Sequence, residues 1–111
     1  MNTVGWLSDV DRGSDGGWWL LPLAGRTVST PPVVYTYASD SQVAEVKRLT
    51  GHLRALGRLN AAQVVALMQA EGYQYVYATE GGLQFDVATL RNSPGLVVVY
   101  HNDHVTLLRQ P

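Results

Sequence analysis

The sequence predicts an α/β fold: a small, mostly parallel sheet of four or five strands with helices packed on it and a C-terminal β-hairpin. Segments with extended and helical spacing of apolar residues alternate in the order β-α-β-α-α-β-α-β-β, which favours parallel strands covered by helices. Clusters of glycine, proline, serine and aspartate separate these segments. The two-residue turn Asn102-Asp103 makes the last strand antiparallel to the one before it.

The N-terminal third contains two expected strands and one short helix. The apolar run from Val4 to Leu7 predicts the first strand, and the turn-forming residues from Ser8 to Gly17 predict a loop. Asp15 is suited to cap a helix that ends at Gly25. Residues 26–37 then predict either one strand interrupted by a pair of prolines or a strand followed by an ordered loop.

Two longer helices follow, and each begins at a capping box, a polar residue with glutamine three positions later. Apolar residues then recur every three or four positions, which marks one buried helix face. The two boxes are Ser39 with Gln42 and Asn60 with Gln63, and the helices end at Gly57 and Gly72.

The C-terminal part predicts three strands and one short helix. Tyr73 to Thr79 forms a strand by composition, and Glu80-Gly81-Gly82 is the loop that leaves it. Asp86 caps the short helix. The strands Leu96 to His101 and His104 to Arg109 form the closing hairpin.

Tyrosines alternate along the first of these strands. Tyr73, Tyr75 and Tyr77 therefore share one face. That face is either a binding platform or the half-buried side of the sheet beneath a helix. We expect the second. Val76 alone gives the opposite face little apolar surface, and the sheet must bury one of its two sides.

Composition bounds the function classes. The chain has 111 residues, 46% of them hydrophobic, which suits one domain with a single core. Eight basic and nine acidic residues give a charge of −1 with no basic run, so nucleic acid is not an expected partner. The absence of cysteine excludes disulfides, thiol catalysis and cysteine-based zinc sites. No apolar run is long enough to span a bilayer.

The expected ligand-facing edge lies where loops leave the parallel strands. Carboxylates beside aromatic rings suit a sugar, because carboxylates bind its hydroxyls while rings cover its apolar face. The alternative is that these residues make turns and cap helices while tryptophan fills the core, which is the more common role for such residues. The candidate ligand-binding residues are Asp9, Asp11, Asp15, Gly16, Gly17, Trp18, Glu80 and Gly81.

His101 and His104 flank the expected hairpin turn and are the weak candidates for a metal site. Across a two-residue turn they would face each other, with Asp103 in an awkward position for a third ligand. Because zinc needs three or four ligands, an exposed polar pair is the preferred interpretation. We therefore expect neither a metal nor another cofactor. No serine lies in a Gly-x-Ser-x-Gly nucleophile elbow, and no catalytic residue is assigned.

Several motifs together resemble a known family. The series resembles the soluble C-terminal segment of large bacterial multi-pass membrane proteins described as glycosyltransferase-like, or as relatives of dolichyl-phosphate-mannose mannosyltransferases. The block from Asp15-Gly16-Gly17-Trp18-Trp19 to Gly25-Arg26 carries most of the resemblance. The remaining matches are Thr30-Pro31-Pro32, Tyr75-Val76-Tyr77, Gly81-Gly82-Leu83, Leu90 with Ser93, and Val99 to Asn102 through Val105.

The resemblance implies that the chain is one α/β domain, residues 1–111, cut from the C-terminal end of a membrane protein. Sugar transfer from a polyprenyl-phosphate donor would reside in the transmembrane portion, so the isolated domain is not expected to be an enzyme. The implied partners are that transmembrane portion and a glycan or polyprenyl-phosphate sugar, at the extracytoplasmic face of the membrane. The implied role is a non-catalytic accessory domain. The alternative is a purely structural or protein-interaction module.

Overall fold

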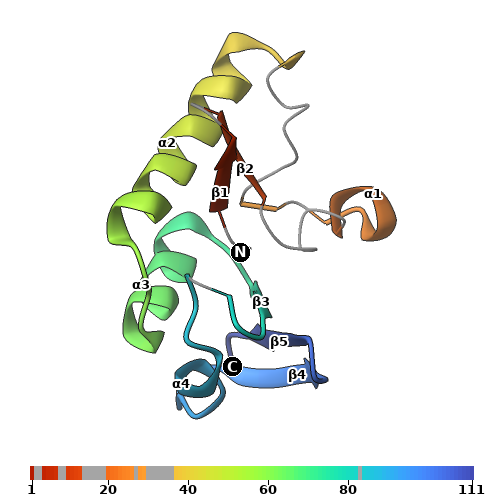
Figure 1. Cartoon of the computed structure of the whole chain (residues 1–111), viewed down its shortest axis with the longest axis vertical. Coiled ribbons are helices and arrows are strands. Elements are labelled where there is room, and N and C mark those ends of the chain that lie inside the picture. The colour runs from red at the N-terminus through yellow and green to blue at the C-terminus, as the bar shows by residue number, and fades with distance from the viewer. Residues whose placement is uncertain (2–3, 8–9, 14–19, 27, 30–36, 83) are drawn as a thin grey trace. The chain divides into compact units, whose positions relative to one another are not determined.

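The computed structural model describes residues 1, 4–7, 10–13, 20–26, 28–29, 37–82 and 84–111 (Figure 1). The chain divides into two compact units. The N-terminal unit comprises residues 2–57, and the C-terminal unit comprises Met1 together with residues 58–111. No helix in the described ranges combines the length and the apolar character needed to cross a membrane.

In its described residues, the N-terminal unit contains a two-stranded sheet and two helices. Strand β1 (Val4–Leu7) pairs antiparallel with β2 (Val10–Gly13), with Leu7 opposite Val10. A short helix α1 (Leu20–Ala24) follows, and α2 (Asp40–Leu56) is the long helix of this unit. The predicted start of α2 is confirmed, because the Ser39 backbone N–H donates to Gln42 Oε1 at 3.3 Å.

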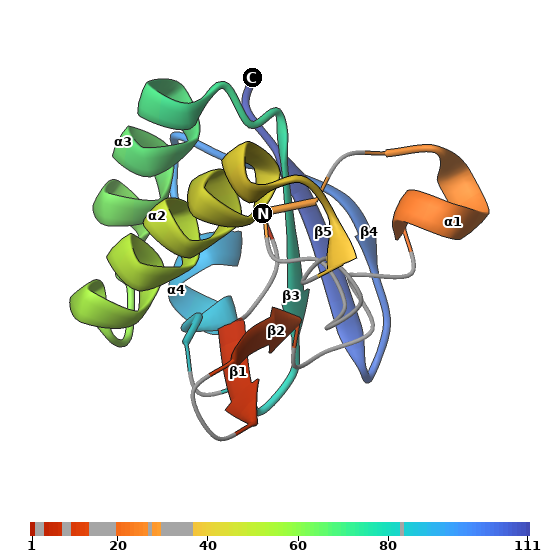
Figure 2. The ribbon, with the colours of Figure 1, turned by 90° about the horizontal axis from the view of Figure 1, so that it is seen from above.

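The C-terminal unit consists of a three-stranded antiparallel sheet with two helices. Its elements are α3 (Ala61–Glu71), β3 (Tyr75–Thr79), α4 (Val87–Arg91), β4 (Val97–His101) and β5 (Val105–Arg109). The strand order is β3-β5-β4, so the last strand in sequence lies in the centre. Figure 2 shows α3 and α4 on one side of this sheet.

The helix starts of this unit follow the sequence pattern. Asn60 Oδ1 accepts a hydrogen bond from the Gln63 backbone N–H at 2.9 Å, and Gln63 Oε1 accepts one from the Asn60 backbone N–H at 3.1 Å. Asp86 Oδ1 accepts a hydrogen bond from the Thr89 backbone N–H at 3.3 Å, which confirms it as the N-cap of α4.

The predicted mostly parallel sheet of four to five strands is wrong. The structure shows a small α+β arrangement whose three-stranded sheet is entirely antiparallel. Within the described ranges, the one parallel contact is an isolated bridge between Leu59 and Phe85. The expectation failed because β1 pairs with β2 and does not join the sheet of β3. Strand β2 lies within the segment that the sequence predicted to be a loop. The expected strand over 26–37 falls largely on residues outside the described ranges, and Arg26, Val28 and Ser29 are not in a strand.

The expectation that the tyrosine face is the side buried beneath a helix is wrong, because the opposite face of β3 supplies the core. Val76 and Ala78 are fully buried, whereas Tyr75 is 42% exposed. On the central strand, Thr106 and Leu108 are likewise fully buried and Arg109 is exposed. Small side chains of β3 therefore belong to the core, whereas Tyr73 and Tyr77 are only half-buried. The core of this unit also includes Leu59, Val64, Met68, Phe85 and Leu90.

We predict that truncation of the buried valine in β3 destabilises the protein far more than truncation of an exposed one. Val76→Ala removes fully buried methyl groups and should lower the free energy of unfolding by about 2 kcal/mol. The matched control Val97→Ala, on the same sheet but 40% exposed, should change it by less than about 0.5 kcal/mol. Urea denaturation of both variants measures the difference. Equal losses would contradict the assigned core.

We also predict that Asp86 contributes to acid sensitivity. The backbone N–H of Thr89 holds the pKa of this carboxyl below its ordinary value of 3.8, with further lowering by the Thr89 hydroxyl and Arg58. Because the folded-state pKa is lowered, the stabilisation is complete above the ordinary value and is lost as the pH falls through the folded-state value. Asp86→Asn should therefore show a smaller loss of stability than the wild type between about pH 5 and pH 3. Thermal unfolding across this pH range tests it, and identical pH profiles would refute it.

Candidate functional site

A surface pocket of about 590 Å³ lies where the end of α3, the start of β3 and the end of β5 converge. Gly72 makes this convergence possible. It has φ 74° and ψ 22°, a left-handed conformation that ends α3 and turns the chain back toward the sheet. The Tyr73 backbone N–H donates to Met68 O at 2.9 Å, which fixes the turn.

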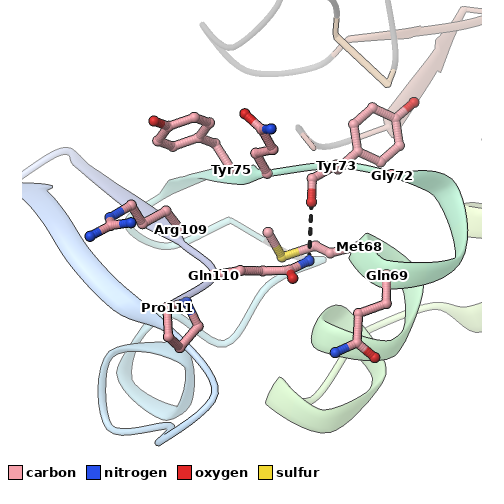
Figure 3. Close-up of a pocket in the computed structure, with 9 residues that line it drawn as sticks. Met68, Gln69, Gly72, Tyr73, Tyr75, Arg109, Gln110 and Pro111 are labelled. Atoms are coloured by element: carbon pink, nitrogen blue, oxygen red, sulfur yellow. Dashed lines mark hydrogen bonds between the residues drawn. The ribbon is translucent and has the colours of Figure 1, made fainter.

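The far wall of the pocket comes from the end of β5. Gln110 continues the pairing with the chain before β3, because its backbone N–H donates to Gln74 O at 3.2 Å. Its side-chain amide Nε2 also donates to Tyr73 O at 3.1 Å, the dashed line in Figure 3. These two bonds place the Gln110 side chain across the middle of the pocket.

Tyr75 and Arg109 flank one side of the pocket. They are directly opposite each other in the antiparallel register of β3 and β5, so both side chains leave the same face of the sheet. Figure 3 shows Tyr75 and Arg109 at one end and Tyr73 at the other. The residues that line the pocket thus include two tyrosines and one arginine.

The lining of the pocket is rich in neutral hydrogen-bonding groups. Amide side chains donate and accept, phenol hydroxyls do the same, and the guanidinium only donates. Among the described lining residues, Arg109 has the one charged side chain. Such a set suits a ligand with several hydroxyl groups and an apolar face. The lining residues are Met68, Gln69, Gly72, Tyr73, Gln74, Tyr75, Arg109, Gln110 and Pro111.

A second polar cluster joins the end of β3 to the β4–β5 hairpin. Thr106 is fully buried, and its hydroxyl donates to Glu80 Oε1 at 3.2 Å. His101 Nδ1 lies 2.8 Å from the same hydroxyl oxygen and 3.7 Å from Glu80 Oε1. Because the hydroxyl proton is directed at the carboxylate, the imidazole donates from Nδ1, and in a neutral ring Nε2 is then the acceptor.

The structure does not pair the two histidines as expected. The register places His101 opposite Thr106, so the hairpin loop is longer than two residues. His104 lies within that loop, where its backbone N–H donates to Asn102 Oδ1 at 2.9 Å and its carbonyl accepts from the Glu80 backbone N–H at 2.8 Å. In the described part of the chain, no three histidine, aspartate or glutamate side chains gather as a metal-binding group.

The predicted ligand-facing edge is only partly described. Asp9, Asp15, Gly16, Gly17 and Trp18 lie outside the described residues. Asp11 belongs to β2 of the N-terminal unit, whereas Glu80 and Gly81 form the turn after β3 in the C-terminal unit. The geometric premise of a shared edge is wrong, because β1 and β3 belong to different sheets.

Sequence reasoning missed the pocket. One signal was present in the sequence, because alternating tyrosines are also compatible with a binding platform. The exposure of Tyr75 agrees better with that alternative than with a buried face. The position of Arg109 opposite Tyr75 depends on the register of β5 in the centre of the sheet, which no local pattern reveals. Comparison with protein-family models, curated proteins and solved structures gave no match to this chain.

We predict that the Thr106 hydroxyl sets the tautomer of His101. Neutral His101 should carry its proton on Nδ1, and Thr106→Val should shift the equilibrium toward Nε2–H because the acceptor is removed. Long-range ¹⁵N–¹H spectra of the imidazole report the tautomer, and the His104 ring serves as the internal control and should be unchanged. An Nε2–H tautomer in the wild type would contradict the assigned bond.

Proposed function

We propose that this chain is a non-catalytic accessory domain that recognises a glycan through the pocket at Tyr73, Tyr75 and Arg109. The observation that carries the proposal is the pocket lining: phenol rings and amide side chains combined with one guanidinium. Pyranose rings have an apolar face that aromatic side chains cover and hydroxyl groups that amides bind. No catalytic role is assigned to any residue of the pocket.

The biological setting of the proposal comes from the sequence resemblance. In a glycosyltransferase-like membrane protein, such a domain would lie at the extracytoplasmic face and hold a glycan or the sugar of a polyprenyl-phosphate donor near the transmembrane portion. Arg109 supports an anionic group on the ligand, because a guanidinium binds phosphate or carboxylate through two parallel hydrogen bonds. The transfer chemistry itself is assigned to the transmembrane portion.

A second candidate function, a protein-interaction module, is favoured by a separate observation. The three valines and the tyrosine of β4, residues 97–100, are all exposed. Apolar side chains grouped on a surface in this way are typical of protein contact sites. The two functions use different parts of the C-terminal unit, so one chain can carry both.

We predict that simple sugars bind the pocket weakly and that Tyr75 is required. Titration of the ¹⁵N-labelled chain with methyl mannoside, methyl glucoside, N-acetylglucosamine and mannose 1-phosphate should move the backbone signals of Tyr73, Tyr75, Arg109 and Gln110. A dissociation constant of about 1 mM, equal to about −4 kcal/mol, is expected for one small sugar. Tyr75→Ala should weaken binding about tenfold by removing the ring that covers the sugar.

Tyr100→Ala is the matched control, because it removes an exposed tyrosine of the same sheet that does not line the pocket. It should leave sugar binding unchanged. Arg109→Gln should weaken mannose 1-phosphate more than methyl mannoside, since only the former presents an anion. Absence of any shift up to about 50 mM sugar, or shifts confined to Glu80–Gly82 and the hairpin, would refute the proposal.

A further inference from the structure

The side-chain amide of Gln110 has a fixed orientation in the pocket. Its Nε2 donates to Tyr73 O at 3.1 Å, and a carbonyl oxygen can only accept a hydrogen bond. The amide nitrogen must therefore face Tyr73 O, and the amide oxygen Oε1 must face the other way. Figure 3 shows Oε1 on the side of the amide away from the dashed bond.

The backbone at both ends of this bond is also held in place. The Gln110 backbone N–H donates to Gln74 O at 3.2 Å, and the Tyr73 backbone N–H donates to Met68 O at 2.9 Å. The Gln110 side chain is thus anchored at its backbone and at Nε2. Oε1 is therefore a preorganised acceptor, and preorganisation lowers the ordering cost of binding a ligand.

This acceptor has no partner of its own. Among the described residues, none donates a hydrogen bond to Gln110 Oε1. Gln110 is half-buried, so a ligand that fills the pocket takes the place of the water around Oε1. A ligand with no donor at this position leaves the oxygen unpaired, which costs binding free energy. Oε1 therefore discriminates among ligands by the donors they carry.

The donor that suits Oε1 best is a neutral N–H group. A hydroxyl both donates and accepts and rotates freely, so a fixed acceptor selects it poorly. An ammonium group donates as well, but the guanidinium of Arg109 lines the same pocket and repels a second cation. The N–H of a secondary amide is uncharged, only donates and has a fixed direction.

We propose that the pocket binds N-acylated amino sugars, with the amide N–H of the sugar donating to Gln110 Oε1. The inference rests on the proposed glycan-binding function and specifies the class of sugar. Tyr75 remains the ring that covers the apolar face of the pyranose, and Arg109 remains available for an anionic substituent. Gln110 is then the residue that determines specificity.

Three methyl glycosides of one sugar test the N–H directly. Methyl N-acetylglucosaminide carries the amide N–H, methyl 2-O-acetylglucoside replaces it with an ester oxygen, and methyl glucosaminide carries an ammonium group at about pH 6. In ¹⁵N titrations of the full chain, the first should bind about fivefold more tightly than either of the others, the effect of one net hydrogen bond. The side-chain carbonyl ¹³C signal of Gln110 should move most with the first sugar.

Gln110→Lys separates the acceptor from the anchor. A lysine ammonium can still donate to Tyr73 O but offers no acceptor, so this variant should bind the two acetylated sugars equally. Val99→Lys is the matched control, because it adds the same charge at a valine that is 49% exposed on the same sheet and does not line the pocket. This control should keep the preference of about fivefold. Unchanged β5 amide signals establish that both variants are folded.

The outcomes separate this inference from the function on which it rests. Equal binding of the three glycosides by the wild type overturns the inference and leaves glycan binding in place. A preference that survives in Gln110→Lys, or that disappears in Val99→Lys, overturns the inference as well. Binding of no sugar up to about 50 mM overturns both. The comparison of glycosides on the wild type needs no variant and decides the question by itself.

Discussion

The C-terminal unit depends on the position of β5 between β3 and β4. Its alternating side chains decide which surface of the sheet is buried: Thr106 and Leu108 point into the core, and Arg109 reaches the pocket. The same strand supplies the hydroxyl that links His101 to Glu80. A slip of one residue in its pairing would exchange these two sets and remove the core, the pocket and the polar cluster together.

Local features were predictable from the sequence because their causes are local. The capping boxes at Ser39 and Asn60, the cap at Asp86 and the left-handed Gly72 each depend on residues within one helical turn. The existence of α2, α3, α4 and the last three strands follows from apolar spacing over short windows. The antiparallel relation of β4 and β5 follows from their short connection.

The sheet arrangement was not predictable in the same way, because it is decided by contacts between distant segments. Alternation of strands and helices favours a parallel sheet, yet β3 and β4 each pair with β5 in the opposite direction. Val10–Gly13 contains one apolar residue and two turn formers, so its pairing with β1 leaves no composition signal. The tyrosine pattern was visible, but which face it occupies depends on the helices that cover Val76 and Ala78.

The order of strands has a consequence for synthesis. β3 and β4 do not pair with each other, so neither has its sheet neighbour until β5 has left the ribosome. At the usual elongation rates of about 5–20 residues per second, β3 waits on the order of seconds for a partner. During that interval the valines of β4 are exposed in the nascent chain, where chaperones act on such apolar segments.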